Sequence, residues 1–220
     1  MRVYFVRHGE SASNAAREAL SSIDPHAGDR LTDLGWEQAR KLGQRLDGEG
    51  LTHIVTSTMR RARETGRGIN ETLGLPLETH PDIHEVRQPD EFYRVLGPAR
   101  TKVSAAVRMA EHDDDPAYAF GNAESFNDVL ARVRSIKRYL ERTKPDQRML
   151  VVRHGNFLRF FLGDSLYRDE FRPRHFLQLW NLKAANTGIT IFDYEPVRQT
   201  GDGYDVGGWR LVTWMDQHHL

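Results

Sequence analysis

The chain has 220 residues, of which 39% are hydrophobic and 28% charged, and its 31 basic and 31 acidic side chains give a formal net charge of zero. This composition excludes a disordered chain and a general binder of nucleic acids, whose affinity depends on excess positive charge. The sequence contains no cysteine, which excludes disulfides, thiolate nucleophiles and cysteine-ligated zinc sites. A single domain over residues 1–220 is expected at this length.

The chain begins with MRVYFV, which is typical of a strand and lacks the charged and apolar regions of a signal peptide. No apolar run of the sequence approaches the ~20 residues that a membrane-spanning helix needs. We therefore expect a soluble, cytoplasmic protein without a membrane partner. Only five of the 31 basic residues are lysine, so an arginine beside a candidate site indicates little by itself.

In the first half of the chain, apolar periodicity and capping signals predict two strands and two helices. Thr32 or Asp33 is a suitable N-cap for the first helix, and Gly74 followed by Pro76 ends the second. In chain order we expect a strand over residues 3–6, a polar stretch over 11–30, a helix whose apolar face runs from Trp36 to Leu46, a strand over 53–56 and a helix over 59–73.

The second half contains the clearest helical pattern, because apolar residues between Phe126 and Leu140 recur with the 3.6-residue period of a helix. Pro145 is expected to stop this helix. The other predictions are an irregular segment over 78–98, a helix over 99–113, a loop over 114–123, a strand over 149–152, a helix over 157–162, and strands over 188–194 and 209–214.

Strands that alternate with helices predict parallel pairing, with helices on both faces of the sheet. We therefore expect an α/β fold, a three-layer α/β/α sandwich with a mostly parallel central sheet. In such sheets, ligands bind at the carboxyl ends of the strands. The tetrapeptide VRHG occurs at this position twice, over residues 6–9 and 152–155, with flanking sequences too different for an internal repeat.

The tripeptide Arg7-His8-Gly9 contains the groups that phosphoryl transfer needs. Imidazole is a good nucleophile at neutral pH, and the guanidinium of Arg7 is a planar fork that fits a phosphoryl group. Gly9 lets the backbone turn tightly as it leaves the strand. A phosphohistidine mechanism is therefore one interpretation, but a hydrogen-bonded histidine in an ordinary turn explains three residues more simply.

Four ordered blocks make the pattern much more specific. They are RHGESASN over residues 7–14, LTDLGWEQA over 31–39, TSTMRRARET over 56–65 and LVVRHGNFLR over 150–159, and NTGITIF and LVTWMDQHHL follow near the end of the chain. With these blocks the sequence resembles the histidine phosphatase superfamily, also called the phosphoglycerate mutase-like family, over nearly its whole length. The resemblance implies the phosphoglycerate mutase-like fold.

The resemblance also implies roles for individual residues. His8 would be phosphorylated, and Arg7 and Arg61 would bind the phosphoryl oxygens. His154 would donate a hydrogen bond to the transferring group. Asn14 matches an asparagine of the family near the same pocket, and its alternative role is to cap a helix or turn.

A proton for the departing alkoxide is the remaining requirement, and a protonated carboxylic acid can supply it. Glu85 in DIHEVRQPDEF matches the family's acid, with Asp82 as its nearest rival and Asp90 and Glu91 further away. The glycine and aromatic framework that usually follows this glutamate is replaced by VRQPDEFYRVLG. The leaving-group pocket is therefore expected to depart from the family pattern.

Other polar residues in the blocks have roles that need no chemistry. Arg60 and Arg63 are expected on a solvated helix face, and Glu10 and Ser11 as caps of the following segment. Arg153 replaces the small residue that the family more often has before its second histidine. We expect it to pair with a nearby carboxylate, or alternatively to reach a second acidic group of the substrate.

These assignments predict a phosphatase that uses neither a metal nor a cofactor, because two arginines and two histidines can balance the charge of the transferring group. The expected partner is a small phosphorylated substrate or a phosphoprotein, and no nucleic acid; a homodimer is left open. The loops over residues 11–30, 85–123 and 163–187 would set the specificity.

Three other functions stay open. A phosphoglycerate mutase would use the same pocket, but the tryptophan and arginine-phenylalanine-glycine-tryptophan elements usual in such mutases are missing from ASNAAREALSSIDPHAGDRLTD. A phosphate-binding pseudoenzyme would be expected to lack the nucleophile or the acid. A metal site of His8, His154 and Glu85 is disfavoured by the positive charges of Arg7 and Arg153.

Overall fold

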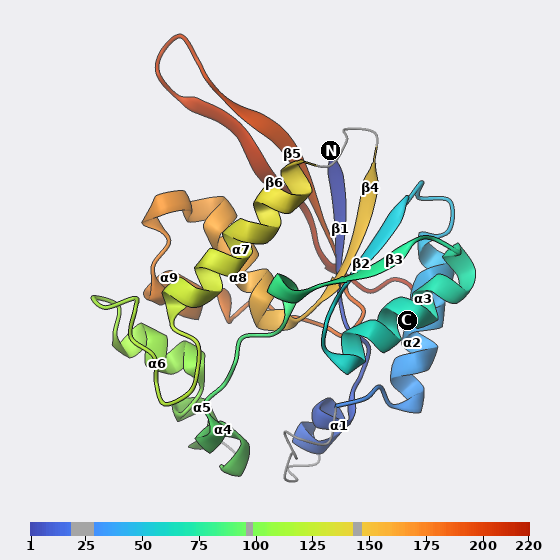
Figure 1. Ribbon diagram of the computed structural model, residues 1–220, viewed down its shortest axis with the longest axis horizontal. Helices are drawn as coiled ribbons and strands as arrows, with labels where there is room; N and C mark the ends of the chain where they lie inside the picture. The colour runs from blue at the N-terminus through green and yellow to red at the C-terminus, as the bar shows by residue number, and fades with distance from the viewer. Residues whose placement is uncertain (19–28, 96–98, 143–146) are drawn as a thin grey trace.

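The computed structural model describes residues 1–18, 29–95, 99–142 and 147–220. Within this part of the chain, six strands form one sheet in the order β3-β2-β4-β1-β5-β6 (Figure 1). The strands are β1 (Arg2–Arg7), β2 (His53–Ser57), β3 (Leu77–His80), β4 (Arg148–Arg153), β5 (Ile189–Gln199) and β6 (Asp205–Asp216).

The strands β1 to β4 pair in parallel, whereas β5 is antiparallel to both β1 and β6. Among the described strands only β5 opposes the direction of the others, so the mostly parallel sheet is confirmed. In the pairing of β1 with β4, Val6 lies beside Val152 and Arg7 beside Arg153. This register places the ends of the two VRHG copies side by side.

Helices cover both faces of this sheet (Figure 1). They are α1 (Ala12–Glu18), α2 (Asp33–Leu46), α3 (Arg60–Leu73), α4 (Asp90–Arg94), α5 (Ala99–Lys102), α6 (Ala105–Glu111), α7 (Phe126–Glu141), α8 (Gly155–Tyr167) and α9 (Pro173–Leu179), with 3-10 turns η1 (Pro81–Ile83) and η2 (Arg168–Glu170). α2 and α3 pack on one face, and α7 and α8 on the other, which confirms the three-layer sandwich. None of these described helices combines the length and apolar character that crossing a membrane would require.

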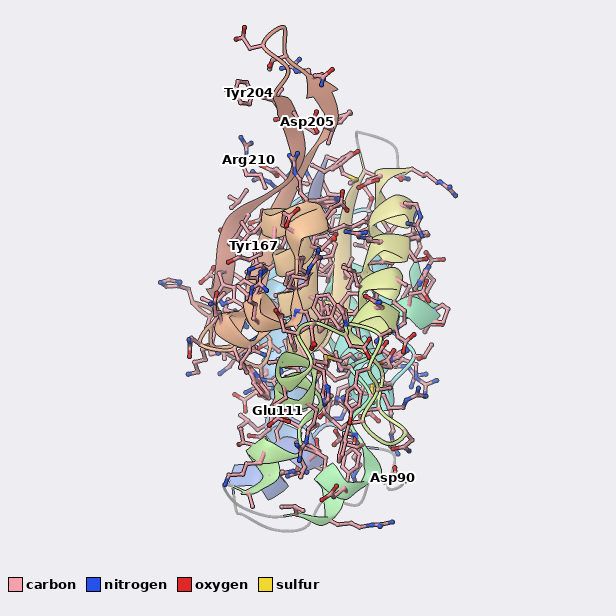
Figure 2. The ribbon with its side chains drawn as sticks, turned by 90° about the vertical axis from the view of Figure 1, so that its left-hand side faces the viewer. Asp90, Glu111, Tyr167, Tyr204, Asp205 and Arg210 are labelled. Atoms are coloured by element: carbon pink, nitrogen blue, oxygen red, sulfur yellow. The ribbon has the colours of Figure 1, made fainter. Side chains whose placement is uncertain are left out.

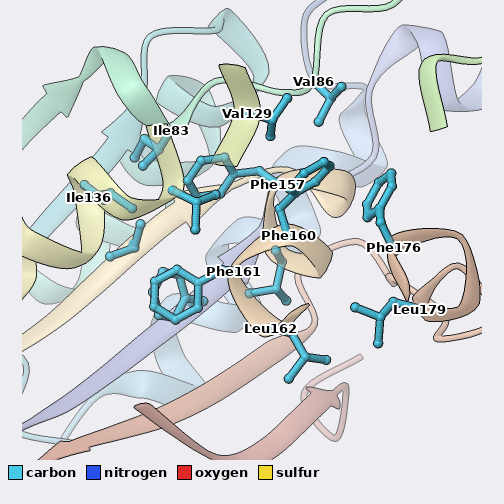
Figure 3. Packing of buried hydrophobic residues seen from close by; sticks show 14 of the residues in the cluster. Ile83, Val86, Val129, Ile136, Phe157, Phe160, Phe161, Leu162, Phe176 and Leu179 are labelled. Carbon is cyan, nitrogen blue, oxygen red and sulfur yellow. The ribbon is translucent and has the colours of Figure 1, made fainter. Parts of the chain in front are cut away.

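The alternating side chains of β1 contribute to a core on each face of the sheet. Tyr4 and Val6 pack with α2 and α3, while Val3 and Phe5 pack with α7 and α8. The core between the sheet and the helices α7 and α8 is the larger one, and the phenylalanines of α8 are among its members (Figure 3). Burial of each such side chain contributes about 1.5–3 kcal/mol, so these contacts hold the helices against the strands that end in VRHG.

A close approach between the segment after β1 and the start of α2 fixes the backbone beside His8. A Cβ atom added at Gly9 would lie 2.6 Å from the carbonyl oxygen of Gly35, and one added at Gly35 would lie 2.0 Å from that of Glu10. A side chain at either position would push the two segments apart. Gly9 does not have a positive φ, so the close contact, and not a tight turn, requires glycine there.

Short elements occupy segments for which none was predicted. Residues 12–18 form α1 within the polar stretch, and the irregular prediction for 78–98 is wrong because β3, η1 and α4 lie there. β3 is an edge strand that pairs with β2, with Leu77 opposite Ile54. Its outward-facing polar residues mask the strand pattern.

The predicted helix over residues 99–113 is in fact two helices, α5 and α6. Oγ of Ser104 accepts a hydrogen bond from the backbone N–H of Val107, as an N-cap serine does, so α6 has its own start. The loop predicted over 114–123 is confirmed. The predicted helix stop at Pro145 lies outside the described residues.

The strands β5 and β6 form a long hairpin that extends past the ends of the other strands (Figure 1). The predicted strands over 188–194 and 209–214 cover only its base, because the outer part is exposed and polar. Tyr204 and Asp205 lie in the outer part of the hairpin, at the opposite end of the molecule from Asp90 in α4 (Figure 2).

Candidate active site

The carboxyl ends of the central strands bring four of the predicted residues together: Arg7, His8, Arg61 and His154. β1 supplies Arg7 and leads to His8, β4 leads to His154, and Arg61 comes from the first turn of α3, which follows β2. The ring centroids of His8 and His154 are 5.1 Å apart. The guanidinium of Arg61 contacts both rings.

The hydrogen bonds of His8 identify which of its ring nitrogens carries the lone pair. Nδ1 lies 2.7 Å from the carbonyl oxygen of Gly9, which can only accept, so Nδ1 carries the proton. Nε2 therefore carries the lone pair, and it accepts a hydrogen bond from Nε of Arg61 at 3.0 Å. The lone pair thus points at a cation that can bind phosphoryl oxygens.

The surroundings of His8 keep its imidazole neutral. Burial holds the pKa of His8 well below its usual value, and the positive charges of Arg61 and Arg7 lower it further. A neutral imidazole is the nucleophilic form. The same two cations favour an anion beside this ring.

The guanidinium of Arg61 connects three groups of the site. Besides the bond from Nε to His8, Nη1 donates to a carboxylate oxygen of Asp29 at 2.9 Å, and Nη2 donates to Nδ1 of His154 at 3.2 Å. All three nitrogens of the guanidinium are therefore directed into the site. This orientation is the one that the predicted role of Arg61 in binding phosphoryl oxygens requires.

His154 has the opposite tautomer. Because Nδ1 accepts from Arg61, the proton is on Nε2, which donates to Oγ of Ser57 at 2.9 Å. Burial, followed by the charge of Arg61, holds the pKa of His154 well below its usual value. The Nε2–H group can donate to a phosphoryl oxygen in place of Oγ of Ser57.

Two residues of the site were missed by sequence reasoning, Ser57 and Asp29. Ser57 ends β2 and belongs to the block TSTMRRARET, and this position was the available signal. The carboxylate of Asp29 binds Arg61 and also accepts from the backbone N–H of Ser13 at 2.9 Å and from Oγ of Ser11 at 3.1 Å. Asp29 thus partly neutralises Arg61 and joins it to the start of α1.

Arg7 approaches the site beside the N-terminus of α8. Its Nη1 donates to the carbonyl oxygen of Ala184, and a Cβ atom added at Gly155 would lie 3.8 Å from its Nε. The charge of Arg7 lowers the pKa of both His8 and His154. Arg7 is therefore close enough to both rings for the predicted contact with an anion at His8.

Glu85 lies at the N-terminus of α8, the helix that begins directly after His154. Its Oε1 accepts the backbone N–H of Val86 at 2.9 Å and that of Phe157 at 3.1 Å, and its Oε2 accepts that of Asn156 at 3.3 Å. Oε2 has the single and longer contact, so it is the less constrained of the two carboxyl oxygens.

The rival carboxylates do not share this position. Asp90 and Glu91 are exposed, and Asp90 accepts a hydrogen bond from the side chain of Asn122. Asp82 belongs to η1, where its carbonyl oxygen is bound by α7. Of these four acids, Glu85 is the one that is hydrogen-bonded to α8.

Tyr93 of α4 was also missed by sequence reasoning. Burial raises the pKa of Tyr93, while the charge of Arg61 lowers it and that of Glu85 raises it. Tyr93 is thus within electrostatic range of Arg61 and Glu85. It belongs to VRQPDEFYRVLG, the segment that replaces the usual framework after Glu85.

Asn14 has the capping contact that was its alternative role, and its side chain also lies near the backbone of the site. Its Oδ1 accepts the backbone N–H of Ser11 at 3.4 Å, which caps the start of α1, and also accepts from Nδ2 of Asn186 at 3.0 Å. The same Nδ2 donates to the carbonyl oxygen of His8 at 2.9 Å. Asn14 is therefore linked to the backbone of His8 through Asn186, which belongs to NTGITIF.

Arg153 departs from its prediction. It is fully buried, its Nη1 donates to the carbonyl oxygen of His154 at 2.8 Å, and its Nε and Nη2 have no hydrogen-bond partner in the described part of the chain. Burial lowers the pKa of Arg153, and the charge of Glu85 opposes this shift. The predicted ion pair is therefore wrong for the described residues, and Glu85 compensates the charge only from a distance.

Of the remaining polar residues of the blocks, the two arginines behave as predicted, whereas the cap bonds expected of Glu10 and Ser11 are not among their side-chain hydrogen bonds in the described part of the chain. Arg60 and Arg63 are exposed on α3. Oε1 of Glu10 accepts a hydrogen bond from Oγ1 of Thr32 at 2.7 Å, and Thr32 is the N-cap of α2. Ser11 is buried just before α1.

No group of three or more histidine, aspartate or glutamate side chains among the described residues could hold a metal ion. The alternative metal site of His8, His154 and Glu85 is therefore not formed there. Both ring nitrogens of each histidine are instead hydrogen-bonded to protein groups.

Comparisons with known proteins identify the family of this chain. A sequence profile for the histidine phosphatase superfamily (branch 1) matches residues 3–207. Two relatives named probable phosphoglycerate mutase GpmB, from Photorhabdus laumondii and Yersinia pestis, are 28% and 37% identical over 220 residues, which is 100% of this chain and 95% of each relative.

Solved structures resemble the whole chain. A mycobacterial glucosyl-3-phosphoglycerate phosphatase in complex with VO3 aligns with a TM-score of 0.71 and 22% identity, over 98% of this chain and 99% of that one. A phosphoserine phosphatase from Entamoeba histolytica aligns with a TM-score of 0.73 and 18% identity, over 100% of this chain and 98% of that one. These two likenesses establish the fold, and the profile match establishes the family: the chain belongs to the histidine phosphatase superfamily.

Proposed function

We propose that the protein is a phosphatase that hydrolyses phosphomonoesters through a phosphohistidine intermediate on His8. The observation that carries this proposal is the neutral, buried imidazole of His8, whose Nε2 lone pair faces the guanidinium of Arg61. A nucleophile with an anion-binding fork beside it is the arrangement that phosphoryl transfer needs. Membership in a superfamily of phosphatases and mutases supports the same chemistry.

In the first step, Nε2 of His8 attacks phosphorus, so that an N–P bond forms as the bond to the leaving oxygen breaks. Arg7, Arg61 and the N–H of His154 bind the nonbridging oxygens and balance their charge. Glu85 gives the proton of Oε2 to the departing alkoxide. The carbonyl oxygen of Gly9 holds the Nδ1–H group, which stabilises the positive imidazole ring of the intermediate.

In the second step, water attacks the phosphorus and the N–P bond breaks. The carboxylate of Glu85 accepts the proton that water loses, so it is protonated again for the next cycle. The electron pair of the N–P bond returns to Nε2 of His8, and inorganic phosphate leaves. As substrates we favour small phosphorylated molecules over phosphoproteins, because His8 and His154 are only 3% and 0% exposed.

Substitution of the nucleophile tests the proposal. His8→Ala is expected to lower the hydrolysis of p-nitrophenyl phosphate by a factor on the order of 10⁴–10⁶. Wild-type protein quenched during turnover should carry an acid-labile, base-stable phosphoryl label that the variant lacks. His218→Ala, at an exposed histidine, is the control and should retain both activity and label. Hydrolysis that survives His8→Ala would rule the proposal out.

A phosphoglycerate mutase is the second candidate, and the names of the relatives favour it. A mutase would return the phosphoryl group from His8 to another oxygen of the same substrate instead of to water. Incubation with 3-phosphoglycerate distinguishes the two functions, with 2-phosphoglycerate and inorganic phosphate measured together. Release of phosphate supports the phosphatase, whereas conversion to 2-phosphoglycerate without release supports the mutase.

A further inference from the structure

We propose that the ion pair between Arg132 and Glu124 positions Glu85 and thereby controls how well this acid delivers its proton. The inference rests on the proposed function, in which Glu85 is the acid. Arg132 lies within α7, and Glu124 lies two residues before α7 begins. The hydrogen bonds of both side chains go to each other and to residues that flank Glu85, so their effect on the chemistry must pass through that segment.

The guanidinium of Arg132 holds the chain on the N-terminal side of Glu85. Its Nη1 donates to the carbonyl oxygen of Asp82 at 2.7 Å and to that of His84 at 3.2 Å. The chain leaves regular secondary structure at His84, where backbone groups need partners other than a helix or sheet. Hydrogen bonds from a charged donor are stronger than neutral ones, so they fix the residue that directly precedes Glu85.

The carboxylate of Glu124 holds the chain on the C-terminal side of Glu85. Its Oε2 accepts the backbone N–H of Arg87 at 2.8 Å, and the N–H of Glu124 donates to the carbonyl oxygen of Arg87 at 3.3 Å. Arg132 binds the same carboxylate with both fork positions, at 2.7 and 2.9 Å. One bidentate pair therefore holds the chain on both sides of the acid.

The same pair contacts the helix that receives the carboxyl group. The guanidinium carbon of Arg132 lies 5.7 Å from the ring centroid of Phe157. The backbone N–H of Phe157 donates to Oε1 of Glu85 at 3.1 Å. Arg132 therefore links the segment that carries the acid to the residue that orients it.

Burial makes this pair rigid. The side chains of Arg132 and Glu124 are 13% and 7% exposed, so water competes weakly for their hydrogen bonds. Loss of Arg132 leaves the Glu124 carboxylate buried without its counter-charge and two carbonyl oxygens without their donor. We expect Glu85 to move relative to the leaving oxygen, and a displacement of about 1 Å can lower a rate by about 10²-fold.

The dependence of kcat/KM on the leaving group distinguishes a positioning role of Arg132 from a general loss of structure. Nitrophenolate leaves without a proton, whereas an alkoxide needs one, so p-nitrophenyl phosphate is compared with glycerol phosphate. Glu85→Gln should lower kcat/KM for glycerol phosphate by about 10²–10⁴-fold and for p-nitrophenyl phosphate much less. Arg132→Met should show the same pattern, with a loss of about 10²-fold on glycerol phosphate.

The double variant Arg132→Met/Glu85→Gln tests whether both residues act in one pathway. If Arg132 acts through Glu85, the double variant is no slower on glycerol phosphate than Glu85→Gln. Losses that multiply, or an Arg132→Met loss that is equal on both substrates, overturn the inference and leave the role of Glu85 intact. A Glu85→Gln variant that slows both substrates alike contradicts the proposed function itself, and the inference with it.

Arg134→Met is the matched control, because Arg134 lies on the same helix but pairs with Asp164 of α8. Its kcat/KM should be unchanged on both substrates, and thermal unfolding should show that every variant is folded. If Arg132→Met does not fold, Arg132→Met/Glu124→Gln replaces it, because removal of both charges avoids a buried unpaired carboxylate. The same leaving-group pattern is then expected, and an equal loss on both substrates again overturns the inference.

Discussion

The two VRHG copies end on neighbouring parallel strands, yet their histidines are held in different ways. His8 donates to the carbonyl oxygen of Gly9 and directs its lone pair at Arg61. His154 accepts from Arg61 and donates to Ser57. The two rings thus have opposite tautomers although burial lowers the pKa of both. The ring of one tetrapeptide thus presents a lone pair and that of the other an N–H donor, because their neighbours differ.

The arginines of the two copies differ even more. Arg7 binds the carbonyl oxygen of Ala184 beside the site, whereas Arg153 is fully buried with two nitrogens that lack a described partner. Their residues pair in register on adjacent strands, so the difference arises from what packs on each strand end. Sequence identity over four residues is therefore a poor guide to function unless the surrounding contacts are known.

The largest expected effect separates the two histidines. His154→Ala removes a hydrogen-bond donor and should lower kcat by about 10²–10³-fold, while the phosphohistidine still forms. His8→Ala removes the nucleophile and should abolish the label. Rapid-quench labelling with a radioactive phosphomonoester measures both. A label on His8→Ala, or none on folded His154→Ala, would reverse the assignment.

Substitution of Arg7 should change the activity, whereas substitution of Arg153 should change the stability. Arg7→Met removes a contact to the phosphoryl oxygens and should lower kcat/KM by about 10²–10³-fold. Arg153→Met replaces a buried cation by an apolar side chain of similar length and should raise the free energy of unfolding by about 1 kcal/mol. Steady-state kinetics and urea unfolding measure the two effects. A marked loss of stability in Arg153→Met would show instead that the surrounding groups stabilise the buried positive charge of Arg153.

The two glycines should differ in stability alone. Alanine at position 9 would bring its Cβ to 2.6 Å from the carbonyl oxygen of Gly35, whereas at Gly155 the nearest contact is 3.2 Å, to the Cβ of Ala184. Gly9→Ala should therefore lower the free energy of unfolding by about 1–3 kcal/mol, and Gly155→Ala by less, because alanine favours the helix that begins there. Equal losses in urea unfolding would argue against the backbone contact.

The smallest effect is one that the two histidines share. Their pKa values in the folded state lie below the value of about 6.5 in the unfolded chain. Their contribution to stability is thus fully present above pH ~6.5, and it is lost as pH falls toward the folded pKa, because only the unfolded chain binds the protons. The loss is at most about 1.4 kcal/mol per pH unit for each histidine.

Urea unfolding of wild type and His8→Gln between about pH 5 and 8 measures this slope. The variant should lose stability less steeply on acidification, since one buried histidine is gone. A slope that His8→Gln leaves unchanged would show that His8 does not remain neutral in the folded protein.

Much of the site could be predicted because its residues follow strands or begin helices within ordered blocks. His8 and His154 follow apolar runs, and Arg61 stands at the start of a periodic helix. The layers of the sandwich also follow from periodicity, since each face of β1 and β4 is apolar. These local signals survive folding because burial and helix formation depend on them directly.

What could not be predicted depends on contacts between distant segments. Asp29 binds Arg61, which is 32 residues away in the sequence, and Asn186 binds the carbonyl oxygen of His8, which is 178 residues away. β3 was missed because Glu78 and Thr79 are exposed on an edge strand. Hydrogen-bond partners of this kind are selected by tertiary packing and leave no period in the sequence.

The two edges of the sheet differ in their capacity to recruit another molecule. An open strand edge exposes backbone groups that can pair with a second chain. β3 is a four-residue edge between Pro76 and Pro81, which makes it a poor template. β6 has 12 residues, exposes Val206, Leu211 and Val212, and pairs only with β5 among the described strands. The hairpin edge is therefore the more open of the two to pairing with a second strand, and it lies apart from His8 and His154 in the fold.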